Sequence, residues 1–158
     1  MGESKTRTIV TYVVGIIIPV VVGLVSSALT SGNMMIFAEL NKPPMSPPAW
    51  LFPVAWTVLY VLMGIASARV VLIKGDDSKK LLVIYVLQLI FNFFWCIFFF
   101  NLSNYWLAAA WLLVMWILVF MFTFISRKVD RIACICFVPY VIWCTFAMYL
   151  NIGVASLN

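Results

Sequence analysis

The side chains in this chain that could recognise a ligand are mostly aromatic rings and amides. Trp56 and Tyr60 are four residues apart, and so are Gln88 and Asn92, with Trp95 following Asn92 after about one turn. On a helix, residues at this spacing lie on one face. Trp and Tyr faces stack on flat conjugated molecules, while amides and indole N–H groups orient polar edges. These faces predict a pocket for a tetrapyrrole, a sterol or an aromatic drug.

Ordinary acid–base or metal chemistry has few available groups. The chain has no histidine, which removes the commonest general base, the usual haem ligand and most zinc sites, so we expect no metal and no cofactor. The acidic residues all fall outside the apolar stretches, and this argues against ion-coupled transport, which usually needs an ionisable group near the membrane midplane. These residues are Glu3, Glu39, Asp76, Asp77 and Asp130.

The composition indicates a membrane protein. Hydrophobic residues make up 66% of the 158 residues and charged residues only 9%, whereas about a quarter of residues are charged in soluble domains. A helical span needs about 20 apolar residues. We therefore predict an all-α integral membrane protein, a compact five-transmembrane-helix bundle forming one domain over residues 1–158. The predicted spans are residues 9–29, 50–73, 81–100, 106–125 and 132–151.

The basic residues predict the orientation of the bundle. With five spans, all ten Lys and Arg residues except Lys42 belong to the side that carries the N-terminus. The positive-inside rule then predicts a cytoplasmic N-terminus and a C-terminus outside. The formal net charge of +5 is explained by this topology and by contacts with anionic lipid, so we expect no nucleic-acid partner. Arg69 is predicted to extend toward the headgroups as an anchor.

Two further stretches have special residues. The predicted loop at residues 30–49 contains two Pro-Pro pairs, Pro43-Pro44 and Pro47-Pro48. Because proline stiffens extended backbone, we expect an ordered lid above a wall that contains Trp56. In the first span, small residues or proline recur every four positions, a spacing that lets another helix approach closely. They are Gly15, Pro19, Gly23 and Ser27.

Several motifs resemble the TspO/MBR family, which includes the bacterial tryptophan-rich sensory proteins and the mitochondrial translocator protein. They are KPPMSPP in the loop, FPVAWTVLYVLMGIA in the second span, NFFWCIFF in the third and VPYVIWCTFAMYLN in the fifth. The resemblance implies a bundle in the bacterial cell membrane, often a homodimer. It also implies a cavity open toward the first loop that binds porphyrins such as protoporphyrin IX and haem, sterols and benzodiazepine-type drugs.

The resemblance also implies which residues form the site. Trp56, Asn92, Trp95, Trp143, Phe146 and Ala147 occupy the motif positions of the pocket. Tyr60 shares the helix face of Trp56, and Pro47 belongs to the covering loop. Some bacterial members are reported to degrade protoporphyrin IX in light, which makes Trp56 and Trp143 candidate catalytic residues.

The chain departs from the family pattern at two places. Many members carry Trp where this chain has Met45, so one aromatic contact to a flat ligand is absent. The C-terminal stretch lacks the Tyr and the basic residue of the animal cholesterol motif, so cholesterol is not the expected ligand. Three functions stay open: a tetrapyrrole receptor or carrier, a light-dependent porphyrin-degrading enzyme, and a passive transporter or scaffold whose aromatic residues only pack.

Overall fold

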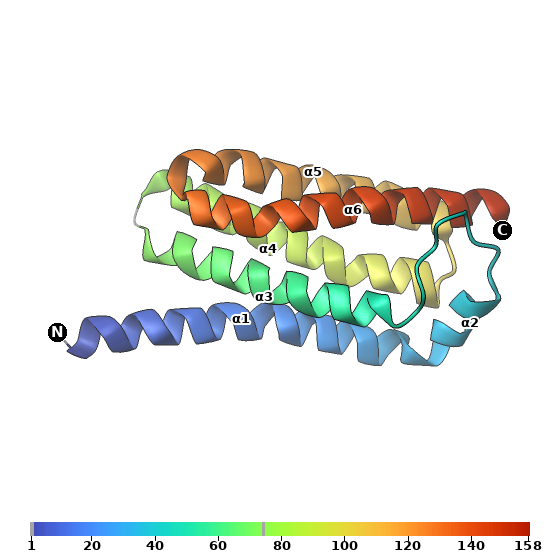
Figure 1. Cartoon of the computed structure of the whole chain (residues 1–158), viewed down its shortest axis with the longest axis horizontal. Coiled ribbons are helices and arrows are strands. Elements are labelled where there is room, and N and C mark those ends of the chain that lie inside the picture. The colour runs from blue at the N-terminus through green and yellow to red at the C-terminus, as the bar shows by residue number, and fades with distance from the viewer. Residues whose placement is uncertain (1, 74) are drawn as a thin grey trace.

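The computed structural model describes residues 2–73 and 75–158 and consists of helices running along one long axis (Figure 1). Five of the helices are long and apolar enough to cross a membrane. The described residues contain no strand. The predicted all-α membrane bundle is confirmed. Its long helices are α1 (Gly2–Thr30), α3 (Leu51–Leu72), α4 (Asp76–Cys96), α5 (Tyr105–Val129) and α6 (Arg131–Leu157).

Local sequence sets where three of these helices begin. The side-chain oxygen of Asn104 accepts a hydrogen bond from the Leu107 backbone N–H at 3.1 Å, which caps α5. Asp130 caps α6 in the same way, through the backbone N–H of Ala133 at 2.7 Å. Such caps satisfy backbone donors that the first helical turn leaves free. α4 begins at Asp76, earlier than the span predicted from residue 81, because carboxylates in a first turn favour helix formation.

Two segments have more structure than the sequence pattern indicated. The first half of the predicted lid, residues 30–49, is helical: it contains a 3₁₀ turn, η1 (Ser31–Asn33), and a short helix, α2 (Met34–Glu39). α4 continues into a π-helical turn, η2 (Ile97–Asn101). The extended part of the loop therefore follows α2.

The small residues of α1 contact α3 within the same chain. A Cβ atom on Gly15 would lie 2.8 Å from the carbonyl oxygen of Gly64, so neither helix has room for a larger residue at this crossing. A Cβ atom on Gly23 would collide with the ring of Tyr60. The helix that the small residues of α1 were predicted to admit is therefore α3. Many of the other side chains of α1 are apolar and exposed.

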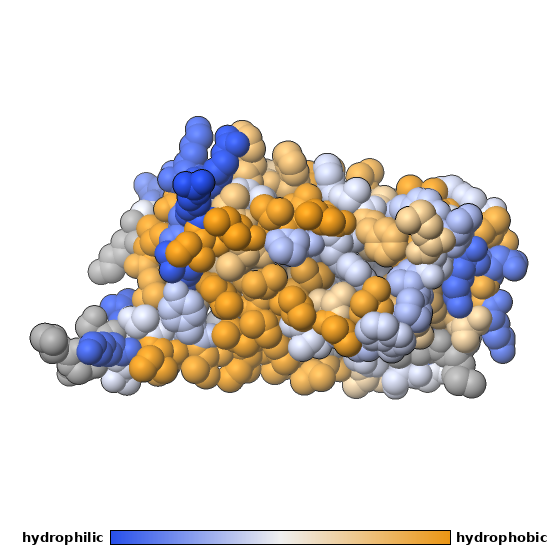
Figure 2. All heavy atoms as spheres, viewed as in Figure 1, coloured by the Kyte–Doolittle hydropathy of each residue, from blue (hydrophilic) through white to orange (hydrophobic). Residues whose placement is uncertain are grey.

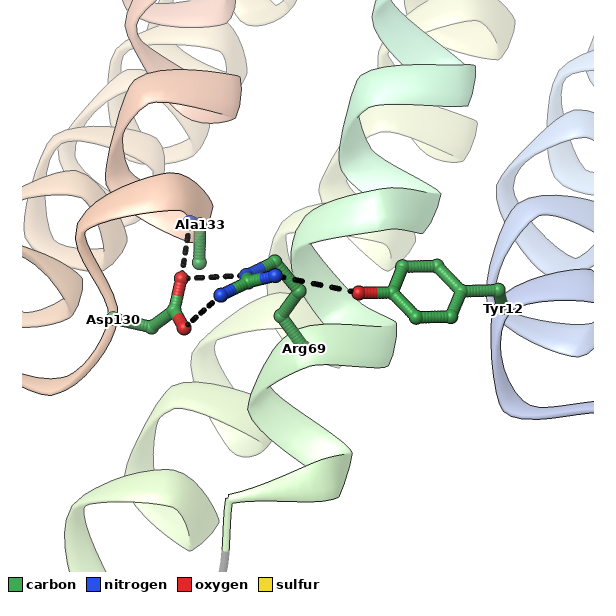
Figure 3. Close-up of polar contacts among 4 residues, drawn as sticks. All are labelled: Tyr12, Arg69, Asp130 and Ala133. Carbon is green, nitrogen blue, oxygen red and sulfur yellow. Dashed lines mark hydrogen bonds and ion pairs between the residues drawn. The ribbon is translucent and has the colours of Figure 1, made fainter. Parts of the chain in front are cut away.

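Arg69 connects three helices at the end of the bundle that carries the N-terminus (Figure 3). Its Nε and Nη2 atoms each donate a 2.8 Å hydrogen bond to the carboxylate of Asp130, and its Nη1 atom lies 3.5 Å from the Tyr12 hydroxyl. The Asp130 side chain is only 9% exposed. The expectation that Arg69 is a headgroup anchor is wrong, because a carboxylate within reach gives its charge a paired, hydrogen-bonded partner.

The molecular surface has the distribution that a bilayer requires. Figure 2 shows apolar side chains across the middle of the visible face and hydrophilic residues near both ends. The N-terminus, the α3–α4 connection and the α5–α6 connection lie at one end, and the C-terminus and the Pro-rich loop lie at the other (Figure 1). This arrangement is that of a multi-pass membrane protein.

Candidate ligand-binding site

Trp56 is one of the residues through which α3 contacts α6. Its ring stacks on Tyr60 at a centroid distance of 5.5 Å, on the helix face that the four-residue spacing predicts the two to share. Its ring also makes edge contacts with Tyr140 at 6.0 Å and with Trp143 at 6.4 Å. Edge-to-face and offset arrangements at these distances are favourable for aromatic pairs. The two candidate catalytic tryptophans are therefore neighbours.

A buried polar network lies beside these rings. The Tyr60 hydroxyl donates to the Asn92 side-chain oxygen at 2.9 Å, and Asn92 Nδ2 donates to the Tyr140 hydroxyl at 3.2 Å. The Tyr140 hydroxyl in turn donates to Gln88 Oε1 at 3.0 Å. The side chains of Gln88 and Asn92 are buried, so the polar face of α4 points into the bundle. Each amide has a partner, as apolar surroundings demand.

Trp143 differs from its neighbours because its polar atom is unsatisfied. Its ring contacts Phe52 and Phe146, each at 6.0 Å, as well as Trp56. The indole Nε1 atom is buried and has no hydrogen-bond partner among residues 2–73 and 75–158. A buried donor without an acceptor costs about 1–3 kcal/mol. Ala147, one turn after Trp143 on α6, is also buried.

Trp95 belongs to an adjoining cluster. Its indole N–H donates to the Asn151 side-chain oxygen at 3.0 Å, and its ring lies 5.4 Å from that of Phe99. Asn151 also donates through Nδ2 to the Tyr105 carbonyl oxygen at 2.8 Å. Trp95 therefore joins α4 to the C-terminal part of α6, and its polar atom is already satisfied.

The extended part of the loop is fastened to α6. The Tyr149 hydroxyl donates to the Pro44 carbonyl oxygen at 2.7 Å. Pro43 is buried against Gly153, where an added Cβ atom would lie 2.6 Å from the Pro43 Cβ atom. Pro47, the predicted contact in the loop, is half-buried.

The side-chain amide of Asn158, the C-cap residue of α6, binds the backbone of the loop at Asn41. The Asn41 backbone N–H donates to the Asn158 side-chain oxygen at 3.1 Å, and Asn158 Nδ2 donates back to the Asn41 carbonyl oxygen at 2.9 Å. At the tip, Met45 has a φ of 65° and an exposed fraction of 84%. A left-handed conformation is uncommon for a residue with a side chain.

Sequence reasoning missed three residues that the structure connects to the predicted site. Tyr140 is fully buried at the centre of the polar network. Its position three residues before Trp143, on the same helical face, was an available signal. Phe52 and Tyr149 gave no comparable signal, because their partners are far away in the sequence.

Comparison with known proteins identifies the group to which the chain belongs. The family model described as TspO/MBR family matches residues 15–157. A tryptophan-rich sensory protein of Cereibacter sphaeroides is 41% identical over 122 residues, covering 77% of this chain and 76% of the relative. A tryptophan-rich protein TspO of Archaeoglobus fulgidus is 30% identical over 155 residues, covering 95% and 98%. The translocator protein of Ovis aries is 32% identical over 118 residues, covering 73% and 70%. This chain therefore belongs to the TspO/MBR family.

Proposed function

We propose that this membrane protein binds a flat, conjugated tetrapyrrole such as protoporphyrin IX or haem, between the Pro-rich loop and the rings of Trp56 and Trp143, as a receptor or carrier. The observation that carries the proposal is the buried, unpaired indole N–H of Trp143 within an aromatic cluster. A propionate carboxylate of the bound ligand would supply the missing acceptor. The neighbouring rings would supply stacking surface.

The available chemistry favours recognition over acid–base catalysis. The side chains around Trp56 are aromatic rings and the neutral amides Gln88 and Asn92. Neutral hydrogen-bonding groups and rings suit a large apolar ligand, since apolar area supplies most of the binding free energy and a few polar contacts fix the orientation. The ring contact between Phe52 and Trp143 would be exchanged for contacts with the ligand, while Trp56 and Trp143 stay in contact.

Tryptophan fluorescence tests this proposal directly. The protein in detergent is titrated with protoporphyrin IX, and we expect saturable quenching with a stoichiometry of one ligand per chain. Trp143→Phe is expected to weaken binding, because phenylalanine keeps a ring and removes the N–H donor. Trp116→Phe is a matched control, since its indole N–H already donates to Thr145 at 2.9 Å. Linear, non-saturating quenching in the wild type would refute the proposal.

The contact between Trp56 and Trp143 favours a second candidate function, light-dependent degradation of the bound porphyrin. Two indole rings with centroids 6.4 Å apart could pass an oxidising equivalent between them. Illumination of the complex in air is expected to bleach the porphyrin absorption in the wild type and more slowly in Trp143→Phe at equal ligand occupancy. A spectrum that persists in the illuminated wild type would remove this candidate and leave the binding function intact.

The orientation and the assembly are also proposals. A cytoplasmic N-terminus and an external C-terminus are supported by the basic residues at the N-terminal end of the bundle, such as Arg127 and Arg131. Labelling of single cysteines placed at Lys42 and at Lys128 in intact cells would test this, with only the cysteine at position 42 expected to react. A homodimer, the assembly that the resemblance implies, would be tested by light scattering in detergent.

A further inference from the structure

An apolar groove of about 680 Å³ lies on the outside of the bundle, between α1, α3 and α4. It is separate from the aromatic site, because none of the residues proposed to contact the tetrapyrrole lines it. Val14, Ile18 and Val22 form the α1 side, and the α4 side includes Leu89 and Phe93. The groove arises because α1 packs mainly on α3 through Gly15 and Gly64 and only lightly on α4.

The polar groups of the groove lie toward the end of the bundle that carries the N-terminus. Tyr85 lines the groove and is only 5% exposed, and its hydroxyl has no hydrogen-bond partner among residues 2–73 and 75–158. Ser67 and Thr11 also line it, and each hydroxyl donates to a backbone carbonyl oxygen of its own helix. Toward Val22 and Phe94 the lining is purely apolar. The groove therefore has one end with hydrogen-bonding capacity and one without.

The length of the groove matches one leaflet of a bilayer. Leu82 and Phe94 mark its two ends on α4, and at 1.5 Å per residue they are roughly 18 Å apart along the helix. The hydrocarbon core of a bilayer is about 30 Å thick, so one leaflet contributes about 15 Å. An extended acyl chain would fill the groove from end to end.

Basic side chains continue the walls of the groove beyond its polar end. Arg7 precedes Thr11 by four residues on α1, and Lys79 precedes Leu82 by three on α4. Residues at these spacings lie on the same helical faces. Both Arg7 and Lys79 are exposed, and the only acidic partner of Lys79 in the described chain is Asp76, in a solvent-exposed pair. An anionic headgroup at this end would therefore meet two positive charges.

We propose that this groove is a binding site for one anionic phospholipid of the leaflet on the N-terminal side. One acyl chain lies along α1 and α4, its ester carbonyl accepts a hydrogen bond from the Tyr85 hydroxyl, and the phosphate lies between Arg7 and Lys79. The lipid supplies the acceptor that the buried hydroxyl lacks, and it covers apolar surface that α1 leaves open. The site does not depend on the tetrapyrrole function.

Native mass spectrometry of the protein released from nanodiscs tests the proposal. The nanodiscs contain equal parts of phosphatidylglycerol and phosphatidylcholine, and detergent washing removes weakly held lipid. We expect one phosphatidylglycerol per chain to survive in the wild type. Val14→Phe should abolish this adduct by filling the groove, whereas Val13→Phe should retain it, because Val13 is equally exposed, at 49% against 48%, and lies outside the groove.

Two further variants separate the polar contacts from the apolar ones. Tyr85→Phe should lower retention about three- to tenfold, the effect of losing one hydrogen bond. Lys79→Gln should reduce the preference for phosphatidylglycerol over phosphatidylcholine, while Lys128→Gln, on another helix at the same end, should not. Melting curves confirm that each variant is folded.

Three results would overturn the proposal. The first is a broad range in the number of lipids retained per chain that is the same in the wild type and Val14→Phe. Lipid that surrounds the protein without a specific site would behave in this way. The second is a surviving adduct with the mass of a free fatty acid. The third is a second copy of the chain that protects the groove, detected as a dimer that Val14→Phe dissociates without change in bound lipid.

Discussion

The hydroxyl of Tyr149 donates a 2.7 Å hydrogen bond to the carbonyl oxygen of Pro44, across a separation of 105 residues. It fixes the proline-rich loop to the exposed side of α6, one turn beyond the aromatic cluster that includes Phe146. Pro44 has a backbone acceptor and no backbone donor. The loop is therefore held from α6 by a single side-chain donor at this point.

Tyr149→Phe should loosen the loop without unfolding the bundle. Losing one partly solvated hydrogen bond costs about 0.5–1.5 kcal/mol, so local opening should become roughly two- to twelvefold more frequent. Hydrogen exchange of the loop amides from Asn41 to Trp50, measured by mass spectrometry, should accelerate by this factor. Thr57→Val, which removes a hydroxyl bonded within α3, is the control. Equal exchange rates in the wild type and Tyr149→Phe would contradict the role of this hydrogen bond.

Replacement of two tryptophans should separate recognition from stability. Trp95→Phe removes a satisfied N–H and leaves Asn151 without its donor, so it should destabilise the protein by about 1–2 kcal/mol. Trp143→Phe removes an unsatisfied N–H, so the unfolding temperature of the free protein should change little. Thermal unfolding in detergent measures both. A larger loss of stability in Trp143→Phe would show that its indole N–H is satisfied in solution.

Tyr140→Phe should lower stability by about 2–3 kcal/mol. The Tyr140 hydroxyl donates to Gln88 and accepts from Asn92, so its removal leaves the buried Gln88 Oε1 without a donor and the buried Asn92 Nδ2 without an acceptor. Thermal unfolding in detergent should give a midpoint lower by roughly 4–12 °C. Replacing all three residues together should cost less than the sum of the single changes, because they share one network. Additive effects would rule out that coupling.

The ion pair between Arg69 and Asp130 should make stability dependent on acid pH. The hydrogen bonds donated by Arg69 hold the pKa of the Asp130 carboxyl below its ordinary value. Because the folded-state pKa is depressed, the pair stabilises the protein fully above about pH 4 and loses its contribution as the pH falls through the folded-state value. Asp130→Asn should therefore lower the unfolding temperature at neutral pH.

The difference between the wild type and Asp130→Asn should shrink as the pH is lowered from 5 toward about 2. Asp76→Asn is the matched control, since the Asp76 side chain is 88% exposed and its pair with Lys79 contributes little. An undiminished difference at the lowest pH would show that Asp130 acts through packing or its helix cap alone.

Met45→Trp should tighten porphyrin binding. Met45 is exposed at the tip of the loop, so a larger ring at this position has room to contact a flat ligand. One additional aromatic contact contributes about 0.5–1.5 kcal/mol, so affinity should rise roughly two- to twelvefold. The fluorescence titration with protoporphyrin IX measures this change, with Met45→Leu as a control of similar size. Equal affinities for the two variants would place residue 45 outside the binding site.

Hydropathy and charge were enough to predict the five-helix membrane fold, because a bilayer restricts spanning segments to long apolar helices. Local spacing also predicted that Trp56 and Tyr60 lie on one helix face and that Asn92 points into the bundle. The pair between Arg69 and Asp130 could not be predicted, since it joins residues that are distant in sequence and near only after the helices pack. The helical first half of the loop was missed because the prolines that follow it dominated the pattern.

The paired hydrogen bonds between Asn41 and Asn158 have a practical consequence for work with this protein. A purification tag or fluorescent reporter fused after Asn158 would be joined directly to the residue that holds the Pro-rich loop and would compete with Asn41 for the same backbone and amide groups. A fusion at the N-terminus would lie at the opposite end of the bundle (Figure 1). Ligand affinities measured on C-terminally tagged protein should therefore be compared with those of protein tagged at the N-terminus.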